Sequence, residues 1–291
     1  MDNDARSANG WLWLTFPIAL LLAIAAGGGI FINGLYRDTP SLVAQAIGQD
    51  AITLLVVLPT LVTGAFLAGR GSQRAWLIWL GVLTYIVYTY ASYAFGIRFN
   101  PLFLIYVALL GCSTYALIGG LVTTDWVGIK ERFTAKTPVK AVSIYLGVFA
   151  ALFYALWLSE AVPASIAGET PQSVIHAGTP TNLVHVLDMA WMLPALGMTA
   201  VSLWRKQPLG HTLAGALLIC LVLLISAILS MVVTMGRAGQ PAVIPQVVIF
   251  GVLFAASIGM MIWYLKNLRA SGTGPLPSGS QHWVMPKTRG R

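Results

Sequence analysis

The chain has 291 residues, of which 57% are hydrophobic and only 9% are charged, whereas soluble domains carry about 25% charged residues. Such a composition excludes an ordinary soluble protein and predicts an all-α bundle embedded in a membrane. The net charge of +8 does not indicate nucleic-acid binding, because the basic residues lie in short loops between apolar segments rather than on one surface.

Eight apolar segments are long enough to cross a hydrocarbon layer about 30 Å thick. We expect them at residues 11–33, 51–69, 75–97, 102–123, 140–159, 183–204, 211–236 and 243–265. The stretch before the first segment carries Asp2 and Asp4 against a lone Arg6, which is unlike the basic start of a signal peptide. The first segment is therefore interpreted as an uncleaved helix, with a cleaved signal peptide as the alternative.

The basic residues are distributed unevenly between the two ends of this arrangement. Of 17 Lys and Arg residues, only Arg37, Arg98 and Arg237 fall in the loops of one side. By the positive-inside rule, the side with the remaining 14 is cytoplasmic. Both termini are then cytoplasmic, and we expect the protein in the cell membrane, the plasma or inner membrane.

The eight helices divide the chain into two halves. Residues 1–124 hold helices 1 to 4, residues 125–139 form a cytoplasmic connecting loop, residues 140–269 hold helices 5 to 8, and residues 270–291 form a basic tail. The tail is rich in Gly, Pro and Ser and cannot bury a core, so we expect it to be a flexible cytoplasmic extension.

The second and sixth helices share a pattern of residues with one offset. The pairs 135 positions apart are Asp50 with His185, Thr53 with Asp188, Pro59 with Pro194, and Arg70 with Arg205. A duplication would make the halves two parallel four-helix repeats about an axis along the membrane normal, and paired interrupted helices would mark a binding site. No such pairing joins helices 3 and 7 or 4 and 8, so chance similarity of two proline-containing helices remains the alternative.

Polar residues near the extracytoplasmic ends of these two helices form the candidate site. Asp188 lies one turn beyond His185 on the same helix face, and Gln49, Asp50 and Thr53 form a comparable set. Because charge inside a membrane is costly, such residues point to function. We expect Asp50, Thr53, His185 and Asp188 to converge on an outward-facing pocket; the alternative is ordinary hydrogen bonding at the membrane surface.

Three residues of the third helix and its loop extend this candidate site. Tyr85 and Tyr88 lie near the middle of the membrane, where their hydroxyls need a backbone carbonyl or a polar ligand as a partner. Arg98 is the only cation of its loop and could pair with Asp50 or with an anionic ligand. Tyr90 and Tyr93 are interpreted as interface aromatics.

No metal site is assigned, because His176, His185 and the nearby carboxylates match no zinc signature. The sequence identifies no cofactor. Gly27, Gly28 and Gly29 lie inside the first helix and indicate close helix packing rather than a phosphate-binding loop.

Three function classes remain compatible with the sequence. The favoured one is a carrier or binding protein for a small molecule or ion, with the bilayer and that ligand as its partners and no nucleic acid. The second is a redox or metal- or haem-dependent membrane enzyme using the same pocket. The third is a membrane assembly or regulatory partner. Substrate and oligomeric state stay open.

Overall fold

The computed structural model describes residues 10–239 and 244–269, and within them it contains helices and no β-strand. Eight of its helices are long and apolar enough to cross a membrane. The prediction of an all-α, multi-pass membrane protein with eight spans is confirmed at this level. The predicted tail, residues 270–291, lies outside the described residues.

The first half holds four of the spans. They are α2 (Thr15–Phe31), a second span made of α3 (Pro40–Ile52), η1 (Thr53–Val57) and α4 (Leu58–Gly69), then α5 (Gln73–Gly96) and α6 (Phe103–Val122). Here η1 is a π-helical segment, so the second span is continuous but locally widened.

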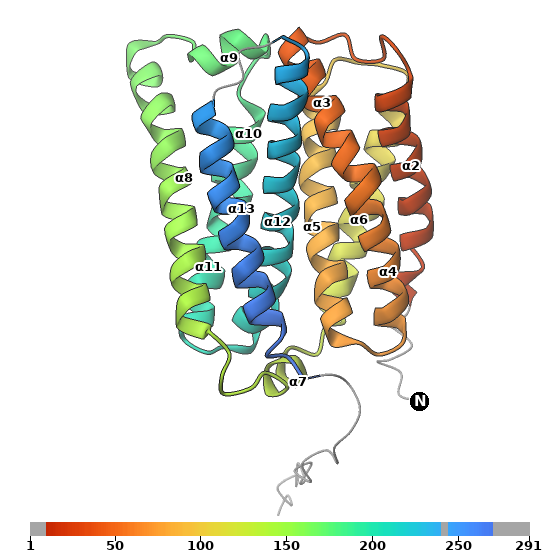
Figure 1. Ribbon diagram of the computed structural model, residues 1–291, viewed down its shortest axis with the longest axis vertical. Helices are drawn as coiled ribbons and strands as arrows, with labels where there is room; N and C mark the ends of the chain where they lie inside the picture. Colours follow the sequence, from red (N-terminus) through yellow and green to blue (C-terminus); the bar gives the residue numbers. More distant parts are fainter. Residues whose placement is uncertain (1–9, 240–243, 270–291) are drawn as a thin grey trace, which may run out of the picture.

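The second half holds the other four spans. They are α8 (Val139–Ala167), a span made of α10 (Leu183–Leu187), η2 (Asp188–Met192) and α11 (Leu193–Trp204), then α12 (Pro208–Arg237) and α13 (Ile244–Leu265). Two short helices outside the spans were not predicted, α7 (Trp126–Glu131) and α9 (Gln172–Ala177). Figure 1 shows α7 and α9 at opposite ends of the bundle.

Two predicted boundaries are wrong by a wide margin. The second span begins at Pro40 rather than at residue 51, because Thr39 accepts the N–H of Leu42 and proline suits the first helical turn. The fifth span continues beyond residue 159 through Pro163 and ends at Gly168, whose φ of 69° closes the helix. Both extensions contain polar residues, and hydropathy therefore placed them in loops.

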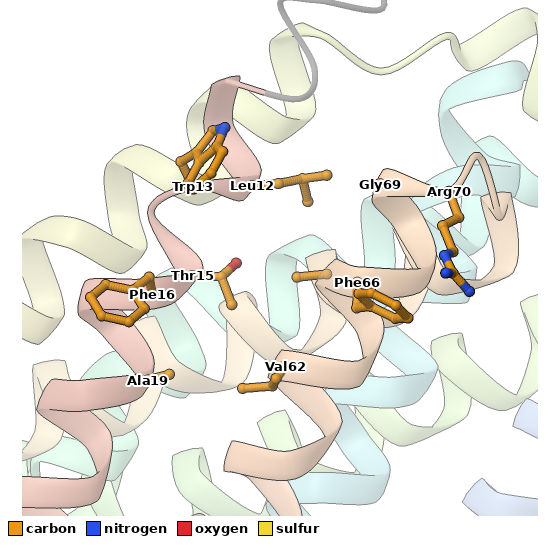
Figure 2. Close-up of a pocket in the computed structure, with 10 residues that line it drawn as sticks. Leu12, Trp13, Thr15, Phe16, Ala19, Val62, Phe66, Gly69 and Arg70 are labelled. Carbon is orange, nitrogen blue, oxygen red and sulfur yellow. The ribbon is translucent and has the colours of Figure 1, made fainter.

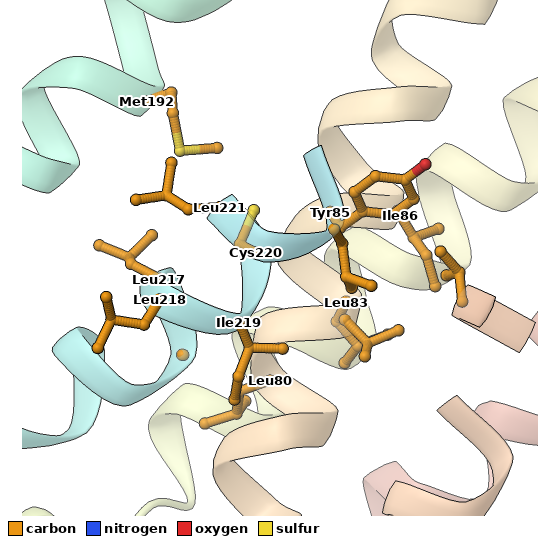
Figure 3. Packing of buried hydrophobic residues seen from close by; sticks show 14 of the residues in the cluster. Leu80, Leu83, Tyr85, Ile86, Met192, Leu217, Leu218, Ile219, Cys220 and Leu221 are labelled. Atoms are coloured by element: carbon orange, nitrogen blue, oxygen red, sulfur yellow. The ribbon is translucent and has the colours of Figure 1, made fainter. Parts of the chain in front are cut away.

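Helices α5 and α12 pack directly against each other at the centre of the bundle. Gly81 of α5 lies against the carbonyl of Ala216 and the side chain of Ile219, and Gly215 of α12 lies against Leu77. Small residues at these positions let the two backbones approach closely. Figure 3 shows the apolar side chains of both helices meeting at this contact.

The two halves lie side by side, with the first half in warm colours and the second in green and blue (Figure 1). Each central helix also contacts the interrupted span of the other half, α12 packing on α3 and α5 on α10. At the end with α7, the Arg74 guanidinium donates to the carbonyls of Leu268 and Lys266 after α13. This contact joins the start of α5 to the last described residues.

Candidate functional site

Asp50 of α3 lies at the centre of a buried polar cluster between α2, α3 and α5. The residue is only 1% exposed. Its Oδ2 accepts a hydrogen bond of 2.5 Å from the Tyr36 hydroxyl, and its Oδ1 accepts one of 3.0 Å from the Tyr93 hydroxyl. The carboxyl group is thus held by two phenols and has no cationic partner among the described residues.

Tyr36 reaches Asp50 from the loop between α2 and α3. Burial, followed by the neighbouring Asp50 carboxylate, raises the pKa of the Tyr36 phenol above its ordinary value. The phenol therefore stays neutral and remains a hydrogen-bond donor to Asp50. The tyrosine hydroxyl is a polar tip on a largely apolar ring, which suits this sealed position.

Gly29 of α2 makes room for the Asp50 carboxylate. A Cβ on this glycine would overlap Asp50 Oδ2 and the Tyr36 hydroxyl, so only glycine fits without a shift. On the same helix, Gly28 packs against Leu102, whereas Gly27 has no neighbour within 4 Å of such a Cβ. Two of the three consecutive glycines thus serve helix packing, and one of these contacts the polar cluster.

Four tyrosine rings surround this region of the protein. The Tyr93 ring contacts those of Tyr36, Tyr90 and Tyr106, with centroid separations of 6.3, 5.5 and 5.3 Å. The buried hydroxyl of Tyr90 has no hydrogen-bond partner within the described chain, whereas that of Tyr106 lies near Tyr36 and Asn100. An unpaired buried hydroxyl such as that of Tyr90 costs stability.

The predicted residues Gln49, Thr53 and Tyr85 extend the same cluster towards α5. Gln49 Nε2 donates to the Tyr85 hydroxyl at 3.1 Å and to Thr89 Oγ1 at 2.8 Å. Thr53 Oγ1 lies 3.4 Å from the Tyr85 hydroxyl. The partner of Tyr85 is therefore a pair of side chains from the interrupted span, not a backbone carbonyl.

Asp188 is the centre of a second cluster, in the other half. It is partly exposed and is the first residue of η2. Its Oδ1 accepts a 2.8 Å hydrogen bond from the Tyr88 hydroxyl of α5, and its Oδ2 accepts a 2.9 Å bond from Trp157 Nε1 of α8. Like Asp50, it is held by uncharged donors.

His185 belongs to this second cluster but does not pair with Asp188. Its Nε2 lies 3.7 Å from Glu160 Oε2, and its ring lies 4.3 Å from the Trp157 ring between centroids. Glu160 also accepts the backbone N–H of Ser173 at 3.0 Å. Trp157 thus contacts both His185 and Asp188, and no direct bond between His185 and Asp188 is found in the described part of the chain.

The structure therefore places the predicted residues in two groups rather than in one pocket. Helix α5 connects them, since Tyr85 bonds with Thr53 and Tyr93 with Asp50 in the first group, whereas Tyr88 bonds with Asp188 in the second. Arg98 does not join either group through the bonds described: its backbone N–H donates to Asp38 at 3.1 Å.

A π-helical segment follows each cluster and precedes a proline. The segments begin at Thr53 and Asp188, and Pro59 and Pro194 follow them, so both features keep the offset of 135. Proline has no N–H, so Pro194 leaves the Met189 carbonyl without its partner in the π-helical register. The Tyr154 hydroxyl of α8 donates to that carbonyl at 2.7 Å.

Several residues of the clusters were missed or misread from the sequence. They are Tyr36, Tyr106, Trp157 and Glu160, which were not singled out, and Tyr93, which was assigned to the membrane interface. Trp157 and Glu160 are three residues apart and so lie on one face of α8. This spacing could have identified them from the sequence. The predicted helix ended at residue 159, which placed Glu160 in a loop, whereas α8 continues to Ala167.

One pocket of about 590 Å³ lies between α2 and α4, away from both carboxylates. Figure 2 shows Trp13 and Phe16 on one side and Val62, Phe66 and Arg70 on the other. The Arg70 guanidinium lies 4.4 Å from the centre of the Phe66 ring. This lining is apolar with one cation at its end, which suits a lipid chain better than a polar solute.

Among the described residues, no group of three or more His, Cys, Asp or Glu side chains is arranged to hold a metal ion. Comparison with protein-family models, with curated proteins and with solved structures finds no match to this chain. Function must therefore be argued from the geometry of the two clusters.

Proposed function

We propose that this protein is a membrane carrier or binding protein for a proton or a small cation, which it takes up at Asp50 and Asp188. The observation that carries the proposal is the bonding of these two carboxyl groups, which lie inside spanning helices and accept only from uncharged donors in the described chain. A buried carboxylate without a cation is unfavourable. Binding a proton or a small cation removes that cost.

The repeated interruption of the two spans supports a carrier. Interrupted helices at corresponding positions of two halves are the usual place of a substrate site in transporters built from repeats. Here η1 and η2 share the sequence offset of 135, and each central helix packs on the interrupted span of the other half. We interpret the chain as two parallel four-helix repeats on this basis.

The position of the carboxyl groups along their spans suggests the side of entry. Asp50 and Asp188 lie in the parts of their helices that are remote from Arg70 and Arg205. With the basic loops in the cytoplasm, by the positive-inside rule, both groups lie towards the outside of the cell membrane. We therefore propose uptake from the extracytoplasmic side, with Asp188 entered first because Asp50 is sealed.

Proton and cation flux in proteoliposomes tests the proposal. Liposomes containing a trapped pH dye are given a membrane potential with potassium and valinomycin, and uptake of labelled sodium and methylammonium is followed in parallel. We expect flux above that of empty liposomes, lowered about tenfold or more by Asp188→Asn and by Asp50→Asn. Tyr88→Phe, which removes a single hydroxyl, should lower it less.

Asp125→Asn is the matched control, because Asp125 only caps α7 by accepting the N–H of Gly128, and asparagine caps equally well. Wild-type flux equal to that of empty liposomes for all three probes would overturn the carrier proposal. Unchanged flux in both carboxyl variants would overturn the site. A Soret band or stoichiometric metal in the purified protein would instead favour the redox enzyme.

A further inference from the structure

A second pocket, of about 790 Å³, opens in the second half at the end that carries the basic loops. Three chain segments line it: the connection from α7 to α8, the turn between α11 and α12, and the end of α13. It contains neither Asp50 nor Asp188. Its chemistry is therefore independent of the site proposed above.

The lining of this pocket is basic without any acidic side chain. Lys130, Lys140 and Lys206 come from α7, from the first turn of α8 and from the turn after α11. None of them forms an ion pair in the described part of the chain. Three cations that converge from separate segments repel one another unless an anion lies between them.

The N-terminus of α8 adds to the positive potential of the pocket. This helix of 29 residues begins with no side-chain cap and no acidic residue in its first turn, and Lys140 and Ala141 of that turn line the pocket. The first N–H groups of a helix have no intrahelical partner and favour an anion. In α8 the Val139 N–H donates to the Thr137 carbonyl at 2.8 Å, so the N–H groups of Lys140 and Ala141 are the ones that face this role. The positive charge of Lys140 is unfavourable at the N-terminus of a helix, because the helix dipole is positive there. A bound anion would offset this repulsion.

Lys206 occupies a backbone conformation that a lysine rarely adopts. Its φ is 55°, the only positive φ of a non-glycine residue in the described ranges. The turn between α4 and α5 has Gly71 at the position 135 residues earlier, with a φ of 86°. Glycine is the low-cost residue there, so the lysine side chain is placed at this pocket at a cost in backbone strain.

Aromatic rings form the apolar walls between these cations. Phe133 packs against the Tyr264 ring at 4.8 Å between centroids, which fixes its position. Trp204 and Trp263 are 53% and 44% exposed and face outwards at this end of the helices. Tryptophan at such a level is typical of the membrane–water interface. A pocket at this position suits a ligand with both a charged and an apolar part.

We propose that this basic pocket binds a phosphate-bearing ligand, with Lys130, Lys140, Lys206 and the N-terminus of α8 holding the phosphate against the aromatic walls. Two sources share this chemistry: the headgroup of an anionic phospholipid, or a soluble organic phosphate. Lysine ammonium groups and free helix N–H groups both donate to phosphate oxygens.

Binding assays with two probes separate these sources. In detergent, inorganic pyrophosphate is titrated into the purified protein; in nanodiscs, retention of phosphatidylglycerol over phosphatidylcholine is measured by native mass spectrometry. Pyrophosphate binding identifies a soluble phosphate, and selective retention of phosphatidylglycerol alone identifies a lipid headgroup. Absence of both would overturn the proposal.

The control variants separate a built site from general positive charge. Lys206→Gln and Lys140→Gln should weaken binding about tenfold, the effect of losing one charge-assisted contact. Lys136→Gln removes the same charge from the same connecting loop but from a residue that does not line the pocket, and binding should stay unchanged. Equal losses in Lys136→Gln and Lys206→Gln would overturn the site.

Lys206→Gly distinguishes a lysine that binds the ligand from one that has only a structural role. Glycine relieves the backbone strain, so this variant should melt at a higher temperature than the wild type while binding as weakly as Lys206→Gln. A variant that melts higher and keeps full binding would show that the lysine serves no ligand, and would overturn its assignment.

Discussion

The two carboxyl clusters occupy related spans but differ in how they are closed. Asp50 is 1% exposed and its two donors, Tyr36 and Tyr93, both belong to the first half. Asp188 is partly exposed, and its donors come from both halves, Tyr88 and Trp157. Gly29 lets α2 pack onto Asp50, whereas Trp157 of α8 contacts Asp188 through its indole N–H.

This comparison separates a sealed carboxyl group from a less buried one. A fully buried carboxyl group that accepts from two phenols is part of the packed interior, and replacing it leaves a buried donor without its acceptor. A partly exposed carboxyl group can exchange a proton or a ligand with its surroundings at lower cost. We therefore expect changes at Asp50 to affect folding more than changes at Asp188.

The largest effect is expected from Gly29→Ala, which should lower the free energy of unfolding by about 3 kcal/mol, the upper end for overpacking. The added methyl overlaps the Asp50 carboxyl group and displaces it from Tyr36. Unfolding in mixed micelles by added SDS measures this. Gly27→Ala is the control, since nothing lies within 4 Å of its Cβ and alanine is the better helix former. Equal stability of the two variants would show that α2 does not seal Asp50.

A smaller loss is expected from Asp50→Asn, about 2 kcal/mol, because an amide offers one acceptor to two phenol donors. Asp188→Asn should cost about 1 kcal/mol, since this residue is less buried than Asp50. The same SDS titration compares them. If Asp188→Asn proved the more damaging change, the distinction between a sealed and an accessible carboxyl group would be lost.

Tyr154→Phe should cost about 1 kcal/mol, because it leaves the Met189 carbonyl without its donor. The cost should shrink in a Pro194→Ala background, where the substituted residue supplies a backbone N–H to that carbonyl. A double-mutant cycle in SDS measures this coupling. Additive losses would indicate that Tyr154 acts elsewhere. The related interruption after Thr53 has no such tyrosine among the described bonds, which makes this a property of the second half.

The smallest effect concerns the pH dependence of the first cluster. The pKa of Tyr36 is raised in the folded protein, so its contribution to stability is complete below the unfolded value of about 10 and is lost as the pH rises above it. The difference in melting temperature between the wild type and Tyr36→Phe should thus be constant from pH 7 to about 9 and then narrow. A difference that already changes between pH 7 and 9 would contradict a sealed phenol.

The sequence predicted the two carboxyl groups of the site but not the side chains that donate to them. Asp50 and Asp188 stood out because an ionisable group inside an apolar segment is rare. Their true donors did not, since tyrosine and tryptophan are expected in any membrane helix near the interface. Tyr93 was misread for that reason, and Glu160 was lost when the end of its helix was placed too early.

The sequence by itself determined the eight spans and the class of protein, because a chain in a bilayer must satisfy its backbone hydrogen bonds within each apolar helix. That requirement is local, so hydropathy and composition are enough to read it. Only the tertiary structure decided which helix faces meet: that α5 stands between the two clusters, that Gly29 seals Asp50, and that three lysines from separate segments share one pocket. These contacts depend on the shape of residues far apart in the chain, which no local pattern records.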